Sequence, residues 1–242
     1  MVSHTNRIKA LLYCSVFINI GLIVLLFAVE QKSHVFALTL ERRGYVTLED
    51  RIHPDYWARF SWENSIEKLH TDFDIAFFGN SITRGSDFQQ AFPDKRIINL
   101  GYSGDNLTGM LRRVSMLKKS NAKKIFIMAG TNDLLQGVSL ENYELRYCQL
   151  LTAIKDSIPA CKIFIQSVLP INGGGVSIKK IQDANDIVEA LSKQLHCQYI
   201  DLYSLYANQD GKLPKEMTKD GIHLYSASYN RWIDKIKPYI YE

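Results

Sequence analysis

The sequence lacks the patterns that mark several common classes of protein. No block of five or more like charges occurs and the net charge is +4, so a nucleic-acid partner is not expected. There is no Cys-x-x-Cys pair and no His-Glu-x-x-His segment, so the usual zinc and redox signatures are missing. There is no Gly-x-x-x-x-Gly-Lys-Ser/Thr loop, and Thr83 stands where a Gly-x-Ser-x-Gly elbow needs its second glycine. These absences leave no sign of a P-loop or of a nucleophile elbow.

Cysteine is also scarce. Of the four cysteines, Cys14 lies in an apolar N-terminal stretch, and Cys148, Cys161 and Cys197 are odd in number and widely spaced. We expect these three to be buried, unpaired thiols, with one disulfide as the alternative. The rest of the composition, with 46% hydrophobic and 22% charged residues in 242, is typical of one globular domain with a short appendage.

One long hydrophobic run is present, at residues 10–29. It carries no charge and has the length that a helix needs to cross a bilayer. We expect a short cytoplasmic tail at 1–9, a transmembrane signal anchor at 10–29, a linker at 30–54 and a domain at 55–242 on the extracytoplasmic side. The alternative is a cleaved signal peptide and a secreted protein, although the run is long for a signal peptide. Lysine and arginine flank both ends of the run, so they do not fix its orientation.

The remaining chain alternates between two patterns. Short, continuously apolar runs predict β-strands at 75–78, 97–100, 125–128, 163–168 and 198–202. Helical patterns lie between them at 105–119, 139–158 and 177–195, and a last helix is predicted to start after Ser226 and to run to about Pro238. The alternation predicts an α/β fold: a three-layer α/β/α sandwich around a flavodoxin-like, five-stranded parallel sheet.

Four short motifs follow one another far apart in the chain. They are Gly-Asn-Ser-Ile-Thr at 79–83, Gly-Tyr-Ser-Gly-Asp at 101–105, Gly-Thr-Asn-Asp at 130–133 and Asp-Gly-Ile-His at 220–223. The first three directly follow predicted strands. Since the carboxyl ends of parallel strands meet at one edge of a sheet, these loops are expected to converge on one crevice.

The residue types in these loops suit one kind of chemistry. Ser81 is the candidate nucleophile, His223 the base that activates it, and Asp220 the carboxylate that orients the imidazole. Gly104 offers a backbone N–H and Asn132 a side-chain amide to a developing oxyanion. Taken singly, the serine could be a helix cap and the glycine and asparagine ordinary turn residues. Together they favour acyl transfer.

A rival pair is His70 with Asp72. It precedes the first predicted strand, and therefore belongs at the opposite edge of the sheet, so we interpret it as structural.

With these four blocks, the chain resembles the SGNH (GDSL-like) hydrolases over about residues 72–240. That family is named after the serine, glycine, asparagine and histidine of four blocks, which read GNSIT, NLGYSGDN, GTND and DGIH here. The resemblance implies an oxyanion hole made by the Ser81 N–H, the Gly104 N–H and the Asn132 side chain, with Gly101 as the alternative glycine. It implies no metal and no organic cofactor. One departure is Asn80, which replaces the more usual aspartate.

The resemblance is nearest to platelet-activating-factor acetylhydrolases and carbohydrate O-acetylesterases. We therefore expect a serine esterase that removes short acyl groups, such as acetyl, from a carbohydrate. The alternatives are a lysophospholipase or lipase-like acyl hydrolase, an O-acyltransferase to a polysaccharide, and a non-catalytic glycan-binding domain. The expected partners are a small-molecule or glycan ester and, through the N-terminal helix, a membrane. The sequence leaves the oligomeric state open.

Overall fold

The computed structural model describes residues 15, 19–22, 25 and 72–242. The chain divides into two units, Met1–Tyr56 and Trp57–Glu242, and the second contains all the helices and strands described below. Within the described residues, no helix has both the length and the apolar character needed to span a bilayer. The predicted tail, most of the anchor at 10–29, the linker at 30–54 and the start of the domain at 55 lie outside those residues, so they stay predictions.

A five-stranded parallel sheet forms the centre of the domain. Its strands are β1 (Ile75–Gly79), β2 (Ile97–Gly101), β3 (Lys124–Met128), β4 (Lys162–Gln166) and β5 (Gln198–Ile200). They lie in the order β2-β1-β3-β4-β5, which is the flavodoxin-like order, and every pair is parallel. The predicted sheet is confirmed, because strands covered on both faces are continuously apolar, and that pattern is visible in sequence.

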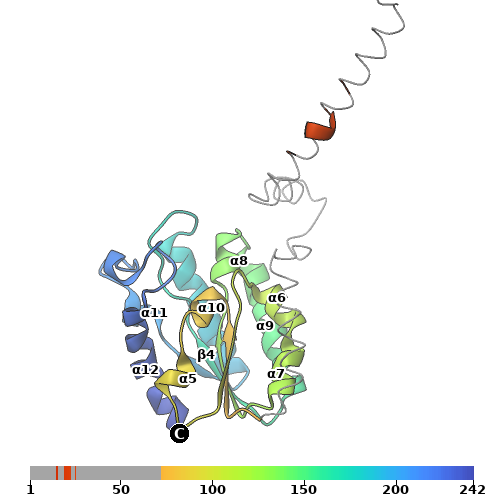
Figure 1. The fold of residues 1–242 in the computed structure, drawn as a ribbon, viewed down its shortest axis with the longest axis vertical. Helices are drawn as coiled ribbons and strands as arrows, with labels where there is room; N and C mark the ends of the chain where they lie inside the picture. Colours follow the sequence, from red (N-terminus) through yellow and green to blue (C-terminus); the bar gives the residue numbers. More distant parts are fainter. Residues whose placement is uncertain (1–14, 16–18, 23–24, 26–71) are drawn as a thin grey trace, which may run out of the picture. The chain divides into compact units, whose positions relative to one another are not determined.

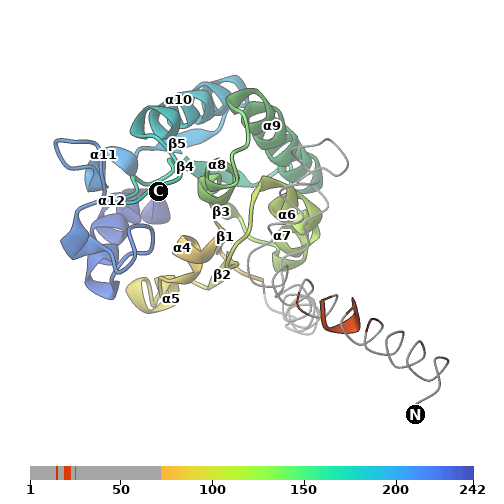
Figure 2. The ribbon, with the colours of Figure 1, turned by 90° about the horizontal axis from the view of Figure 1, so that it is seen from above.

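Helices cover both faces of the sheet, giving three layers (Figure 1). Seen from above, α6, α7, α9 and α10 lie on one face, and α4, α5, α11 and α12 lie on the other (Figure 2). Their bounds are α4 Ser81–Arg84, α5 Phe88–Ala91, α6 Leu107–Arg112, α7 Val114–Ser120, α8 Thr131–Leu135, α9 Leu140–Ser157, α10 Ile178–Gln194, α11 Tyr203–Tyr206 and α12 Tyr229–Tyr241, with short 3₁₀ turns at Lys215–Met217 and Ser226–Ser228.

A row of phenylalanines fixes the strands that carry the site. Phe77 of β1, Phe126 of β3 and Phe164 of β4 are in register and fully buried, with ring centroids 5.0 and 4.6 Å apart. Phe77 also stacks on Phe88 of α5, which meets Trp232 of α12 edge-on. Each such ring pair contributes about 0.5–1.5 kcal/mol beyond the burial of its surface. The carboxyl ends of β1 and β3 are therefore held at a fixed separation.

The long helices begin where the sequence predicts. The Ser139 hydroxyl accepts from the Asn142 N–H at the start of α9, and the Ser177 hydroxyl accepts from the Lys180 N–H at the start of α10.

The predicted end of the last helix, at about Pro238, is wrong. Helix α12 continues to Tyr241 with Pro238 inside it. The Lys124 ammonium donates to the carbonyls of Tyr239 and Ile240 at 2.9 and 3.0 Å, which stabilises the final turn from outside the helix.

The prediction of one helix over 105–119 is also wrong. The segment forms two helices, α6 and α7, which are separated at Arg113 with φ −114° and ψ 19°. Both helices keep the helical spacing of apolar residues, so the pattern shows no break. The break coincides with the inward turn of the Arg113 side chain, which is 3% exposed and bonded at the carboxyl edge of the sheet.

Candidate active site

Ser81 follows β1 at the start of the short helix α4. The cap of this helix is Asn80, whose side-chain oxygen accepts from the Ile82 N–H at 2.9 Å. Ser81 is therefore not the capping residue, and its hydroxyl is free for another partner. The Ser81 Oγ lies 2.8 Å from Nε2 of His223, which is 142 residues further along the chain.

The imidazole of His223 is held on its other side by Asp220. Its Nδ1 lies 2.7 Å from Oδ2 of Asp220, so Nδ1 donates and Nε2 is left to accept from Ser81. The other carboxylate oxygen accepts from the backbone N–H groups of Ile222 and His223 at 3.0 and 2.8 Å. Partial burial raises the pKa of Asp220, but the hydrogen bonds from His223 and Ile222 outweigh it and lower this pKa to about 2. The carboxylate is therefore ionised at all ordinary pH values.

The loop that carries this pair is fixed by two residues that the sequence analysis did not identify. The Thr218 hydroxyl donates to the His223 carbonyl at 2.8 Å and accepts from the Gly221 N–H at 2.9 Å. The Asn172 N–H donates to the Gly221 carbonyl at 2.7 Å, joining this loop to the one after β4. Gly221 has φ +87°, and a Cβ there would lie 2.0 Å from the Asn172 carbonyl oxygen. The position therefore requires glycine.

Two candidate oxyanion donors come from the loops after β2 and β3. Gly104 has φ +71°. The Asn132 amide donates to the Asp105 carbonyl at 2.6 Å, which brings the two loops together. Within residues 72–242, no hydrogen bond uses the N–H of Ser81 or of Gly104. The Gly101 N–H, by contrast, donates to the Asn99 side chain at 3.0 Å, so the geometry favours Gly104 over Gly101.

A buried ion pair lies beneath these loops. Asp105 and Arg113 are 2% and 3% exposed, and Arg113 Nε lies 2.7 Å from Oδ2 of Asp105. The guanidinium is flanked by the rings of Phe78 and Tyr102, at 4.1 and 4.3 Å from their centroids. The sequence analysis did not identify Arg113, because next to the exposed Arg112 it looks like a second surface charge.

A second buried carboxylate, Asp133, joins α8 to α6. Both of its oxygens face the Leu107 N–H, at 3.3 and 3.1 Å. Burial raises the pKa of Asp133 to about 7, against the lowering effects of the Leu107 N–H and of the Arg146 charge. This carboxyl group therefore titrates near neutral pH.

An apolar cleft runs from Thr131, the neighbour of Asn132, toward the loop after β4. Leu134 of α8 and Val168 and Ile171 of that loop are among the residues that line it. The cleft is too narrow to hold a water molecule.

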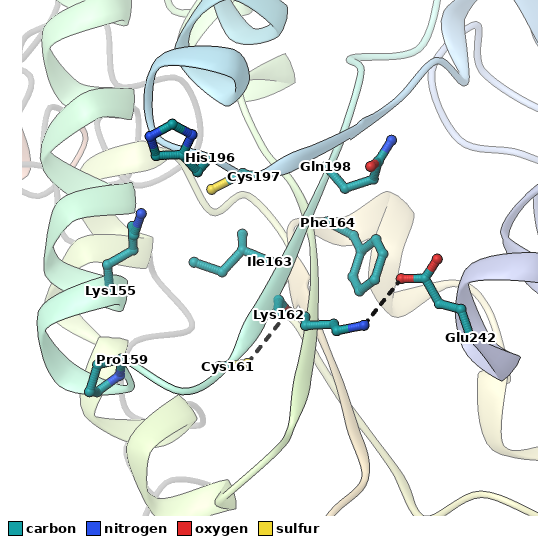
Figure 3. Close-up of a pocket in the computed structure, with 10 residues that line it drawn as sticks. All are labelled: Lys155, Pro159, Cys161, Lys162, Ile163, Phe164, His196, Cys197, Gln198 and Glu242. Atoms are coloured by element: carbon teal, nitrogen blue, oxygen red, sulfur yellow. Dashed lines mark hydrogen bonds and ion pairs between the residues drawn. The ribbon is translucent and has the colours of Figure 1, made fainter.

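A larger cavity, of about 420 Å³, lies at the opposite edge of the sheet, beside the first residues of β4 and β5 (Figure 3). Its lysines are engaged: Lys155 donates to the Leu195 carbonyl at 2.6 Å, and Lys162 pairs with Glu242 at 3.8 Å. Burial raises the pKa of the Cys161 thiol to about 12, which removes its nucleophilic form at neutral pH. None of the residues that line this cavity belongs to the four motifs.

Two other predictions concern histidine and cysteine. The rival residue His70 lies outside the described residues, and its neighbour Asp72 accepts from the Asn121 side chain at 3.0 Å. Cys148, Cys161 and Cys197 are unpaired, as predicted, but they are half-buried rather than fully buried.

Comparisons with known proteins identify the family and the fold. The model of the GDSL-like lipase/acylhydrolase family matches residues 77–231, well over half of the chain. A solved structure from Streptococcus pneumonia, described as a platelet activating factor, is 26% identical with a TM-score of 0.67, covering 75% of this chain and 92% of that one. Two further solved structures share the fold. A GDSL-like lipase from Bacteroides thetaiotaomicron is 22% identical with a TM-score of 0.66, covering 76% of this chain and 98% of that one. An acetyl xylan esterase from Geobacillus stearothermophilus is 17% identical with a TM-score of 0.57, covering 69% of this chain and 94% of that one. A comparison with curated proteins found no match.

Proposed function

The chain belongs to the GDSL-like lipase/acylhydrolase family, and we propose that within it this protein is a serine esterase that removes short acyl groups, chiefly acetyl, from carbohydrates. Membership of this family implies the class of reaction, which is hydrolysis of an ester bond. The observation that carries the serine mechanism is the chain of hydrogen bonds from Asp220 through His223 to Ser81, with distances of 2.7 and 2.8 Å.

In the acylation step, Nε2 of His223 takes the Ser81 proton as Oγ attacks the ester carbonyl carbon. A serine hydroxyl is a weak nucleophile at neutral pH, so it needs this base. The ionised Asp220 keeps Nδ1 protonated and stabilises the imidazolium that forms. The imidazolium then gives its proton to the departing alcohol oxygen as the carbon–oxygen bond breaks, leaving an acyl-Ser81.

Three donors are available to the oxyanion of each tetrahedral intermediate. They are the N–H groups of Ser81 and Gly104 and the amide of Asn132. Donors fixed before the reaction avoid the cost of reorganisation, and removing one typically lowers kcat by about 10²- to 10³-fold. In the second step His223 takes a proton from water as the water oxygen attacks the acyl carbon. The bond from that carbon to Oγ then breaks, Oγ takes the proton from His223, and the carboxylic acid leaves.

The short acyl group is proposed because an acetyl xylan esterase is among the solved structures that share this fold. An acetyl methyl group needs no deep pocket, whereas a fatty acyl chain would need one, and neither cavity described above is lined by Ser81 or His223. The acetyl xylan esterase from Geobacillus stearothermophilus illustrates that this fold accommodates such substrates.

The proposal is tested with purified protein on p-nitrophenyl esters from acetate to octanoate and on acetylated sugars. We expect kcat/KM to be highest for acetate and to fall as the chain lengthens. Ser81→Ala should abolish turnover, whereas Ser204→Ala, at an exposed serine of α11, should leave it unchanged. A preference for octanoate would favour the lipase-like alternative, acyl transfer to an added polysaccharide would favour the transferase, and turnover by Ser81→Ala would exclude the serine mechanism.

The extracytoplasmic location is part of the proposal. It rests on the predicted anchor at residues 10–29. Digestion of the domain by protease added to intact cells would support it, and protection of the domain until the cells are broken would contradict it.

A further inference from the structure

We propose that Arg113 is a positioning residue for catalysis: it holds the Asn132 amide in place for the oxyanion by fixing the Asp105 segment to which that amide is bonded. This inference rests on the proposed esterase function and assigns a role within the same site.

The guanidinium of Arg113 bonds to three segments around the site. Arg113 donates through Nη2 to the Gly79 carbonyl at 2.9 Å, two residues before Ser81. It donates through Nη1 to the Leu100 carbonyl at 2.8 Å, at the end of β2. It donates through Nε to the Asp105 carboxylate at 2.7 Å. A single buried side chain therefore ties the nucleophile loop to the glycine loop.

The Asp105 segment is also bonded to Asn132. The Asp105 carbonyl accepts from the Asn132 Nδ2 at 2.6 Å, so the Asp105 segment sets where that amide lies. An amide nitrogen has two N–H groups, and this bond uses one of them. The other is left for an oxyanion, in an orientation that depends on Asp105 and, through it, on Arg113.

Arginine suits this position because it can donate to several acceptors at once. The planar fork presents donors in fixed directions to three acceptors and stacks between Phe78 and Tyr102. A lysine would keep the charge but supply one ammonium group without the fork. The chain also breaks a helix at this residue, between α6 and α7, where the backbone leaves helical geometry.

The competing explanation is that Arg113 only stabilises the fold. A double-mutant cycle separates the two, because residues that act through one another are not additive. Steady-state kinetics on p-nitrophenyl acetate are measured for the wild type, Arg113→Lys, Asn132→Ala and the double variant, each checked for folding by thermal melting. Arg96→Lys is the matched control, since Arg96 pairs with Asp74 at 2.9 Å on the far edge of the sheet and is largely exposed.

We expect Arg113→Lys to lower kcat by about 10²-fold with KM unchanged, since a small misplacement of a catalytic group has that effect. In the Asn132→Ala background the same exchange should cost less than about threefold. Arg96→Lys should change neither parameter. Equal losses in both backgrounds, a change in KM alone, or no loss in kcat would overturn the inference.

Two further variants allow the outcome to be interpreted if Arg113→Lys does not fold or if the serine mechanism is wrong. Asp105→Asn keeps the size of the side chain and one acceptor oxygen, so it serves the same cycle if Arg113→Lys does not fold. Ser81→Ala is assayed alongside. Activity in Ser81→Ala would mean that the serine mechanism itself is wrong, whereas an inactive Ser81→Ala with an additive cycle would reject only the role of Arg113.

Discussion

Replacing Asp220 by asparagine should lower kcat by about 10²- to 10³-fold and leave the fold intact. The asparagine oxygen can still accept from the Ile222 and His223 backbone N–H groups, which now bond to Oδ1. Its amide nitrogen then faces Nδ1 of the imidazole, where two donors oppose each other. The ring is driven toward the tautomer that carries its proton on Nε2, and that nitrogen can no longer accept the Ser81 proton.

The magnitude follows from the exposure of the pair. The side chains of Asp220 and His223 are 43% and 36% exposed. The effective dielectric constant between their charges in the transition state is therefore between that of water and that of a protein surface. Opposite charges about 4 Å apart attract by about 1 kcal/mol in the first case and about 4 kcal/mol in the second. These figures correspond to about 5-fold and about 10³-fold in rate, and the unfavourable tautomer places the expected loss in the upper part of that range. The same exchange in a buried triad costs about 10⁴-fold, so a smaller loss is expected here.

The assay is kcat for p-nitrophenyl acetate, with Asp210→Asn as the control at an exposed aspartate outside the four motifs. Since the site is open, added formate should partly restore Asp220→Ala. A loss of less than about threefold in Asp220→Asn would refute the role given to the carboxylate. In the wild type, the pKa of about 2 means that Asp220 stays ionised above about pH 4, so its own titration causes no loss of activity near neutrality.

Three further predictions concern other positions. Asn132→Ala should lower kcat by about 10²-fold with little change in KM, measured by steady-state kinetics, because the amide acts on the oxyanion and not on the bound ester. Because the folded-state pKa of Asp133 is raised to about 7, the free energy of unfolding should fall as the pH rises from about 4 to 7. In urea titrations of Asp133→Asn, this fall should be smaller than in the wild type by up to about 4 kcal/mol. Gly221→Ala should destabilise the domain by about 2 kcal/mol or more and lower kcat, whereas Gly173→Ala, where an added Cβ meets no atom within 4 Å, should melt like the wild type.

The elements that the sequence predicts are those set by local patterns. Continuously apolar runs mark strands buried on both faces, and the two longest helices open at serines whose side chains cap them, Ser139 and Ser177. The motif residues could be placed together because parallel strands end at one edge of a sheet. His223 lies within hydrogen-bonding distance of both Ser81 and Asp220, as the motifs suggested.

The supporting residues depend on contacts that no local pattern encodes. Arg112 and Arg113 are adjacent and identical in type, yet one is exposed and the other is among the most buried charges of the described domain. Thr218 and Asn172 look like ordinary loop residues, and their importance lies in bonds to His223 and Gly221. The helix break at Arg113 has the same origin, since it depends on acceptors at the ends of two strands.

The most direct test of the account is labelling by a fluorophosphonate probe, followed by mass mapping of the modified peptide. Such a probe reacts with a serine that a base activates, so it reports the arrangement of hydroxyl and imidazole without any assumption about the natural ester. The account predicts one phosphonylated residue, Ser81, and loss of labelling in His223→Ala. Labelling at another serine, or undiminished labelling in His223→Ala, would contradict it.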